Sequence, residues 1–203
     1  MDLSVRPAQQ RRSREAWSRV LDAGVAVLTE KGSEGFTIAA VCERAGVTPP
    51  TIYRRTPNKD ALFLAVYEHG IAGIRATETE LASQPWGDPD EMTLVGQAVG
   101  TIVSIFFTHR DFLRAVIIIS ATNEAVRNRG VDASNALAAT FDRLTDPVTT
   151  PGMHARRAAV FQMVFGALVL RTGFGADFAT PTPVDDAQFV EALQEIAVAA
   201  WTT

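Results

Sequence analysis

Residues 46–60, GVTPPTIYRRTPNKD, bring together side chains that suit a negatively charged partner. Thr51 and Tyr53 offer hydroxyl groups, and Arg54 and Arg55 offer guanidinium groups. Hydroxyls donate to phosphate oxygens or base edges, and a guanidinium can donate to two acceptors at once. These residues lie either in a loop or on a short helix that its neighbours hold in place.

Two adjacent prolines favour the helix. Proline is tolerated in the first turn, where its missing N–H would have no partner. Because Pro50 disfavours a helical conformation at Pro49, we expect the helix to begin at Pro50 or one residue earlier. It should run through Tyr53 to about Arg55. Asn58 is a good cap for the next helix, expected to continue to about residue 81.

Two further helices are expected before this stretch. Apolar residues recur with helical spacing in the first helix, which should end near Lys31-Gly32: Trp17, Val20, Leu21, Gly24 and Leu28. Thr37 is expected to cap a short second helix, and Gly46 to close it. Cys42 should be a small packed residue of that second helix.

The rest of the chain shows helical spacing and almost no strand alternation, so the predicted fold class is all-α. Helices are expected at about 89–108, 111–120, 123–145, 153–172 and 185–201. The last one carries a single apolar stripe: Phe189, Ala192, Leu193, Ile196, Ala197 and Ala200.

The helix at 153–172 is apolar on two faces: Phe161, Val164, Phe165 and Leu168 on one, and Val160, Met163, Ala167 and Leu170 on the other. Such a helix must be buried on both sides. We therefore expect a homodimer through the last two helices, which Leu168→Glu or Ile196→Glu should break. A central helix in a monomeric bundle is the alternative.

Charge is unevenly placed along the 203 residues. Residues 1–60 hold ten Lys or Arg and seven Asp or Glu, although the whole chain has a net charge of -4. A basic N-terminal part suggests that only this part meets a polyanion, with chance scatter as the alternative. The Arg-rich start lacks the apolar run of a signal peptide, and the single cysteine fits a reducing cytosol, so we expect a cytoplasmic protein. Residues 92–109 carry no Asp, Glu, Lys or Arg, but their polar residues favour a buried helix over a membrane span.

Three short helices with a glycine-containing turn between the second and third make a helix-turn-helix. Residues 20–62 also resemble the N-terminal domain of the tetracycline-repressor (TetR) family of bacterial transcription regulators. The matching elements are Leu21-Asp22-Ala23, the Lys31-Gly32 turn, Thr37, Ala45-Gly46-Val47-Thr48, Thr51-Ile52-Tyr53 and Asn58-Lys59-Asp60-Ala61-Leu62. The resemblance implies a DNA-binding domain at 1–57 and a larger helical domain at 58–203 for effector binding and dimerisation.

The resemblance also implies a set of DNA-binding residues: Thr37, Pro49, Pro50, Thr51, Tyr53, Arg54, Arg55 and Lys59. Thr37, Tyr53 and Lys59 would contact backbone phosphates. The two prolines, Thr51 and Arg54 would face the major groove, where a guanidinium can bind guanine O6 and N7. Arg55 could reach either kind of site.

The sequence departs from the family pattern in two places. Many relatives carry an aromatic residue or His at position 55 and an aromatic residue at 56, where this chain has Arg55 and Thr56. Thr56 should remove an apolar anchor of the recognition helix. Ala39 and Ala40 replace residues that are commonly polar, which should reduce the phosphate contacts.

No enzyme motif was found, and His69, His109 and His154 are too far apart in sequence for a local metal site, so we expect neither metal nor cofactor. The resemblance implies a dimeric repressor that an effector releases from a near-palindromic operator, and the aromatic residues with few charges suggest an apolar or aromatic effector. The effector-binding residues are unknown, and the candidates are Trp86, Phe106, Phe107, Phe112, Met163 and Phe165. The alternatives are a DNA-binding protein without a ligand, or a helical small-molecule-binding protein or enzyme without DNA binding.

Overall fold

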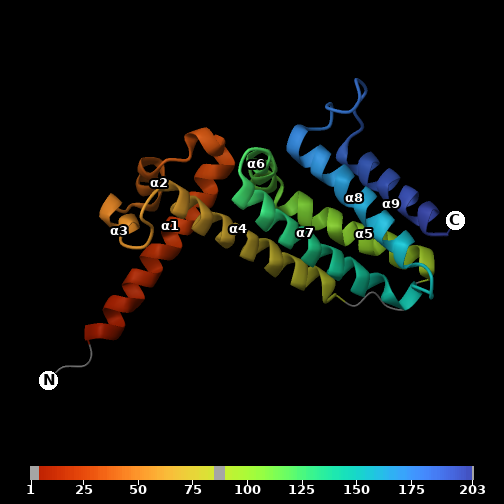
Figure 1. Cartoon of the computed structure of the whole chain (residues 1–203), viewed down its shortest axis with the longest axis horizontal. Helices are drawn as coiled ribbons and strands as arrows, with labels where there is room; N and C mark the ends of the chain where they lie inside the picture. The colour runs from red at the N-terminus through yellow and green to blue at the C-terminus, as the bar shows by residue number, and fades with distance from the viewer. Residues whose placement is uncertain (1–4, 85–89, 203) are drawn as a thin grey trace. The chain divides into compact units, whose positions relative to one another are not determined.

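The computed structural model describes residues 5–84 and 90–202, with side chains from Gln10 onward. Over these residues the chain forms nine α-helices and one short 3-10 helix, without strands, which confirms the all-α class. It divides into two compact units, Met1–Gly73 and Ile74–Thr203. The functional boundary expected after residue 57 stays a prediction. Helix α4, Lys59–Ala82, contributes residues to both units (Figure 1).

The first unit contains α1 (Val5–Gly35), α2 (Ile38–Ala45), α3 (Pro49–Tyr53) and the first part of α4. Gly32 interrupts α1 with φ 63° and ψ −167°, at the place where the sequence predicts its end. Thr37 Oγ1 accepts the N–H of Ala40 at 3.1 Å, which confirms the predicted cap of α2. Gly46 closes α2 in the left-handed conformation that glycine adopts without strain.

Helix α3 begins at Pro49 and ends at Tyr53, two residues earlier than predicted. The N–H groups of Arg55 and Thr56 both donate to the Ile52 carbonyl, at 2.9 and 3.0 Å. Pro57 prevents the helix from continuing further, since it disfavours the helical region at Thr56, the residue before it. Asn58 Oδ1 then accepts the N–H of Ala61 at 2.9 Å, which confirms the predicted cap of α4.

Side chains from every helix of the first unit enter its interior: Val20, Leu28, Phe36, Val41, Ile52, Leu62 and Val66 are fully buried. The rings of Phe36 and Phe63 meet edge to face, with centroids 5.6 Å apart. Cys42 is buried as predicted, and burial raises the pKa of its thiol. Burial of Ile52 places one face of α3 against this interior and leaves its other residues toward the surface.

The second unit contains the end of α4 and then α5 (Glu91–Thr108), α6 (Arg110–Ser120), α7 (Glu124–Thr145), η1 (Asp146–Val148), α8 (His154–Phe174) and α9 (Asp186–Thr202). The five predicted helices are found within two residues of the expected bounds. α9 lies antiparallel along α5 (Figure 1). Trp201 Nε1 donates to Glu91 Oε1 at 3.0 Å, and Gln194 Nε2 donates to the Gly96 carbonyl at 2.9 Å.

α5 and α8 are long and apolar enough to cross a membrane by length and composition, a test that a core helix also passes. The buried residues of α5 are Leu94, Val95, Ala98, Val99, Thr101, Ile102, Val103, Ile105 and Phe106. Except for Leu94 and Thr101, they form one apolar core with residues of α7, α8 and α9, including Phe141, Leu168, Ala197 and Trp201. The prediction of a buried helix at 92–109 is confirmed.

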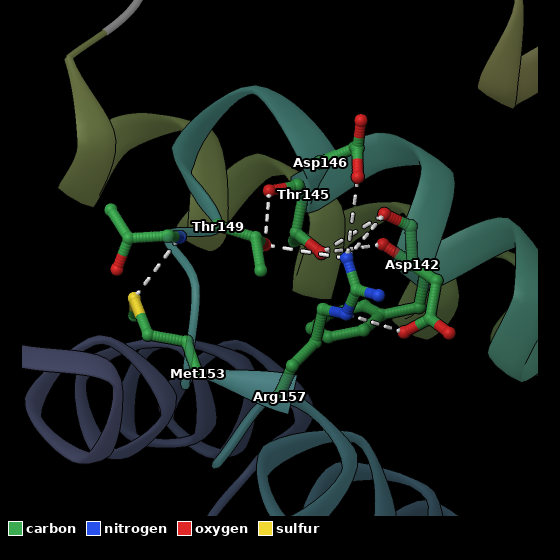
Figure 2. Close-up of polar contacts among 8 residues, drawn as sticks. Asp142, Thr145, Asp146, Thr149, Met153 and Arg157 are labelled. Carbon is green, nitrogen blue, oxygen red and sulfur yellow. Dashed lines mark hydrogen bonds and ion pairs between the residues drawn. The ribbon is translucent and has the colours of Figure 1, made fainter. Parts of the chain in front are cut away.

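A single arginine organises the connection between α7 and α8 (Figure 2). Arg157 Nε lies 2.9 Å from Asp142 Oδ1, and its Nη1 donates to the Asp142 carbonyl and to Thr149 Oγ1, each at 3.3 Å. Asp146 Oδ1 lies 3.7 Å from the same Nη1. Arg157 therefore ties the end of α7 and the turn after it to the first turn of α8.

Candidate DNA interface

Helix α3 presents its polar residues outward from the first unit. Pro49, Pro50 and Arg54 are exposed, and 53% of the Tyr53 surface is accessible. Thr51 is half-buried. Pro50 and Arg54 are four residues apart, so they lie on the same side of the helical turn. This surface offers hydroxyl and guanidinium donors together with apolar proline rings.

The residues predicted to contact phosphates lie at the starts of α2 and α4. Thr37 is exposed, and its Oγ1 accepts the Ala40 N–H while its own O–H group can still donate. Lys59 is the first residue of α4 and is also exposed. All eight predicted DNA-binding residues belong to the first unit.

The two consecutive arginines differ in their contacts. Arg54 Nη2 lies 3.5 Å from Thr51 Oγ1, which is the outer limit for a hydrogen bond. Arg55 instead bonds to α1: its Nη2 donates to the carbonyl oxygen of Ser13 at 3.3 Å and to Ser13 Oγ at 3.1 Å. Its Cζ also lies 5.3 Å from the centre of the Trp17 ring.

A surface hollow of about 770 Å³ lies between α1 and the α2–α3 turn. It is lined by Gln10, Arg12, Ser13, Ala16, Trp17, Gly46, Val47, Thr48, Thr51, Arg54 and Arg55. None of these α1 residues was predicted to belong to a site, and Trp17 was predicted to lie in the apolar stripe of the first helix. Ser13 and Trp17 are four residues apart and therefore lie on one face of α1. This spacing could have indicated that the two side chains contact the same group.

Thr56 occupies the position where many relatives carry an aromatic residue that anchors the recognition helix. It is buried, and its hydroxyl donates to the Ile52 carbonyl at 3.3 Å. This internal bond satisfies the hydroxyl and lets the side chain enter the interior. The expectation that Thr56 weakens the packing of α3 stays a prediction.

Both terminal helices of the second unit have an outward apolar face. On α8, Val160, Phe161, Val164 and Leu168 are buried, whereas Met163 and Leu170 are exposed. On α9, Leu193 and Ala197 are buried, whereas Ile196 is 58% exposed. The sequence grouped Val160 on one face with Met163 and Leu170, but Val160 lies in the core while those two residues are exposed. The dimer itself stays a prediction.

The aromatic effector candidates have different environments. Phe106 and Phe112 are buried, Phe107 and Phe165 are half-buried, and Met163 is exposed on α8. Trp86 lies outside the described residues. A separate polar hollow of about 490 Å³ is lined by Arg75, Glu78, Thr79, Ala82, Ser83, Ala136, Thr140 and Arg143.

Polar groups also occur at the α5–α6 junction, where burial lowers the pKa of His109 and its Nε2 lies 2.8 Å from Thr77 Oγ1. Among the described residues, no group of three His, Cys, Asp or Glu side chains is placed to hold a metal ion.

A short helix with exposed residues, joined to the helix before it by a turn that contains a left-handed glycine, is the arrangement of a helix-turn-helix. Residues 20–66 match the family model described as bacterial regulatory proteins, tetR family. The N-terminal part of the chain is therefore similar to the N-terminal domain of this family.

The sequence is also similar to the HTH-type transcriptional regulator UidR of Escherichia coli (strain K12). The two are 27% identical over 117 residues, which cover 57% of this chain and 55% of UidR. The chain thus matches about half the length of this relative.

Solved structures show the same fold along most of the chain. A transcriptional regulator from Rhodococcus sp. RHA1 has a TM-score of 0.66 at 18% identity, covering 90% of this chain and 93% of the other. The regulator FadR from Bacillus subtilis, in complex with stearoyl-CoA, has a TM-score of 0.60 at 16% identity, covering 91% and 98%.

Proposed function

We propose that this protein is a transcriptional repressor that a small-molecule effector releases from a near-palindromic operator. The observation that carries the proposal is the placement of α3. Tyr53 and the following Arg54 are exposed at its end, on a compact unit formed by α1, α2, α3 and the first part of α4, and residues 20–66 match a model of regulatory proteins. The net positive charge of residues 1–60 supports contact with a polyanion, although the whole chain is acidic.

Phosphate contacts fix the protein on the duplex without reading its sequence. We assign this role to Lys59, Tyr53 and Thr37. Lys59 supplies a positive charge, and the two hydroxyls supply neutral donors from α3 and from the start of α2. Each of these residues is exposed in the free protein.

Sequence is read by groups that reach the base edges in the major groove. We assign this role to Arg54 and Thr51, with the rings of Pro49 and Pro50 available for contact with a thymine methyl group. Arg54 is the strongest candidate because its guanidinium is exposed and can bind guanine O6 and N7 together.

A second copy of the chain is proposed to cover the outer face of α8 and α9. Met163, Leu170 and Ile196 are exposed there, although they lie on helices whose inner faces already fill the core. Large apolar side chains grouped on one exposed face mark interaction sites. A two-fold dimer also accounts for an operator with two half-sites.

The effector is proposed to bind in the second unit and to be apolar or aromatic. Phe106, Phe161 and Phe165 form a chain of ring contacts within that unit, with centroids 5.7 Å apart in each pair. FadR, whose fold is similar, was solved with stearoyl-CoA, a ligand with a long apolar part. Because α4 contributes to both units, we propose that it transmits the binding of the effector.

We also propose that the protein acts in the cytoplasm, where its DNA target lies, and that it has no enzymatic activity. Its matched relative is a transcriptional regulator.

The test is a selection of duplexes from a random-sequence pool with the unmodified protein. The proposal expects an enriched motif with two-fold symmetry and half-sites about one DNA turn, or a multiple of it, apart. A compound that raises the thermal stability of the protein should also weaken its binding to that motif, since coupling is reciprocal. A pool without enrichment at low salt would contradict the proposed function.

A further inference from the structure

Arg55 follows the helix proposed to read DNA, but its guanidinium is engaged by α1. Nη2 donates to the Ser13 carbonyl and to Ser13 Oγ, and Cζ lies over the Trp17 ring. Ser13 and Trp17 are four residues apart and share one face of α1. Because a guanidinium donates in its plane and stacks through its face, a single group makes both contacts.

Helix α3 needs such support at its end. Five residues cannot form a stable helix alone, and Ile52 is the one residue of α3 that is buried. The start of α3 is fixed by the turn before it, where the Val47 N–H donates to the Cys42 carbonyl at 3.0 Å and the Thr51 N–H donates to the Thr48 carbonyl at 2.9 Å. Arg55 provides a contact to α1 at the opposite end.

We propose that Arg55 is a positioning residue that fixes the end of α3 on α1, and that Ser13 and Trp17 support sequence recognition through it. This inference rests on the proposed DNA-binding function. Arg54, the proposed reader, is the residue directly before Arg55. Groups that recognise a ligand must be held in place by neighbours whose own conformations are fixed. A direct contact of Arg55 with a phosphate is the opposing interpretation.

Salt-dependent binding separates the two roles. The probes are a duplex enriched by the unmodified protein and a scrambled duplex of the same composition. Arg55→Ala and Arg55→Lys should both weaken binding to the enriched duplex by roughly tenfold, with little change on the scrambled duplex. Lysine keeps the charge but not the planar fork, so it should not rescue binding. The salt slope should stay unchanged, whereas Lys59→Ala should lower it by about one.

Trp17→Leu should reproduce the loss, and the double variant with Arg55→Ala should be no weaker than Arg55→Ala alone, because both changes remove the same contact. The positioning role is overturned if Arg55→Ala lowers the slope by about one and weakens both duplexes while Arg55→Lys restores binding. That pattern identifies a phosphate contact.

Hydrogen exchange tests the same inference without DNA. The N–H groups of Arg55 and Thr56 donate to the Ile52 carbonyl, and Arg55→Ala should speed their exchange severalfold. The N–H of Val41 in α2, which donates to the Thr37 carbonyl at 3.1 Å, is the internal control. Unchanged exchange at residues 55 and 56 would overturn the positioning role. If the unmodified protein enriches no duplex, the proposed function fails, and the exchange result still decides the role of Arg55.

Discussion

Gly24 and Val66 pack so closely that a β-carbon at position 24 would collide with Val66 Cγ2. Val66 is fully buried, and its branched side chain has few alternative rotamers. Gly24→Ala should therefore lower the free energy of unfolding by about 1–2 kcal/mol, although alanine is the better helix former. Urea unfolding followed by circular dichroism measures the change.

Gly73→Ala is the matched control for this substitution. Gly73 is an exposed residue of α4, and a β-carbon there would meet nothing within 4 Å. Gly73→Ala should therefore raise the free energy of unfolding by up to about 1 kcal/mol. If both substitutions changed the free energy of unfolding equally, close packing at Gly24 would not contribute to stability.

Arg157→Ala should destabilise the second unit. The side chain is only 12% exposed, and its loss leaves Asp142 and Thr149 without their shared donor. We expect the free energy of unfolding to fall by about 1–3 kcal/mol. Arg127→Ala, at an exposed position of α7, should change it by less than about 0.5 kcal/mol. A similar result for both variants would mean that the contacts in Figure 2 do not stabilise the α7–α8 connection.

The stability of the second unit should depend on the ionisation of Asp186. Burial raises the pKa of this carboxyl, but hydrogen bonds and charges from Arg110 and Arg171 outweigh that effect and lower it below its usual 3.8. Arg110 Nη2 lies 2.6 Å from Oδ2, and Arg171 Nη2 lies 2.8 Å from Oδ1. A lowered folded-state pKa means that the stabilisation is present above pH 3.8 and is lost as the pH falls through the folded value.

Asp186→Asn should therefore cost roughly 0.5–1 kcal/mol at pH 7, a modest amount because the carboxyl is half exposed. The difference from the unmodified chain should shrink as the pH falls below 3.8. Thermal unfolding at several pH values measures it, with Asp132→Asn on the exposed side of α7 as the control. A difference that does not depend on pH would contradict the ion-pair account.

Ile196→Glu should convert the proposed dimer into a monomer without unfolding it. Ile196 is exposed in the single chain, so the charge would become buried only in the dimer. Val131→Glu places the same charge on an exposed apolar site of α7 and should leave a dimer. Light scattering at micromolar concentration distinguishes the two states. A monomer for the unmodified chain would contradict the proposed interface.

Local signals predicted most of the fold. Thr37, Gly46 and Asn58 act through hydrogen bonds or backbone angles within a few residues, so their sequence positions predicted where α2 and α4 begin and where α2 ends. The short α3 was predicted for the same reason. Its last residue was predicted two positions too late, because Pro57 was expected to stop the helix only near Arg55.

Contacts between distant residues could not be predicted from the sequence. The contact of Arg55 with Ser13 joins residues 42 positions apart, and no periodic pattern specifies such a pair. For the same reason, the sequence did not show which face of α8 packs inside its own chain, so Leu168→Glu is a poor test of the dimer. The pattern showed two apolar faces on α8, but only the structure shows that Leu168 is buried in the core of its own chain.

Binding of the enriched duplex by Arg54→Ala, compared with Lys59→Ala, tests the central claim most directly. Each variant is titrated against the enriched and scrambled duplexes at several salt concentrations. Arg54→Ala should weaken binding to the enriched duplex by about 1–3 kcal/mol, affect the scrambled duplex much less, and relax the preference at one base pair per half-site. Lys59→Ala should weaken both and lower the salt slope by about one. Equal losses on both duplexes for Arg54→Ala would make it a phosphate contact, and no change for either variant would contradict the assignment of α3 as the recognition helix.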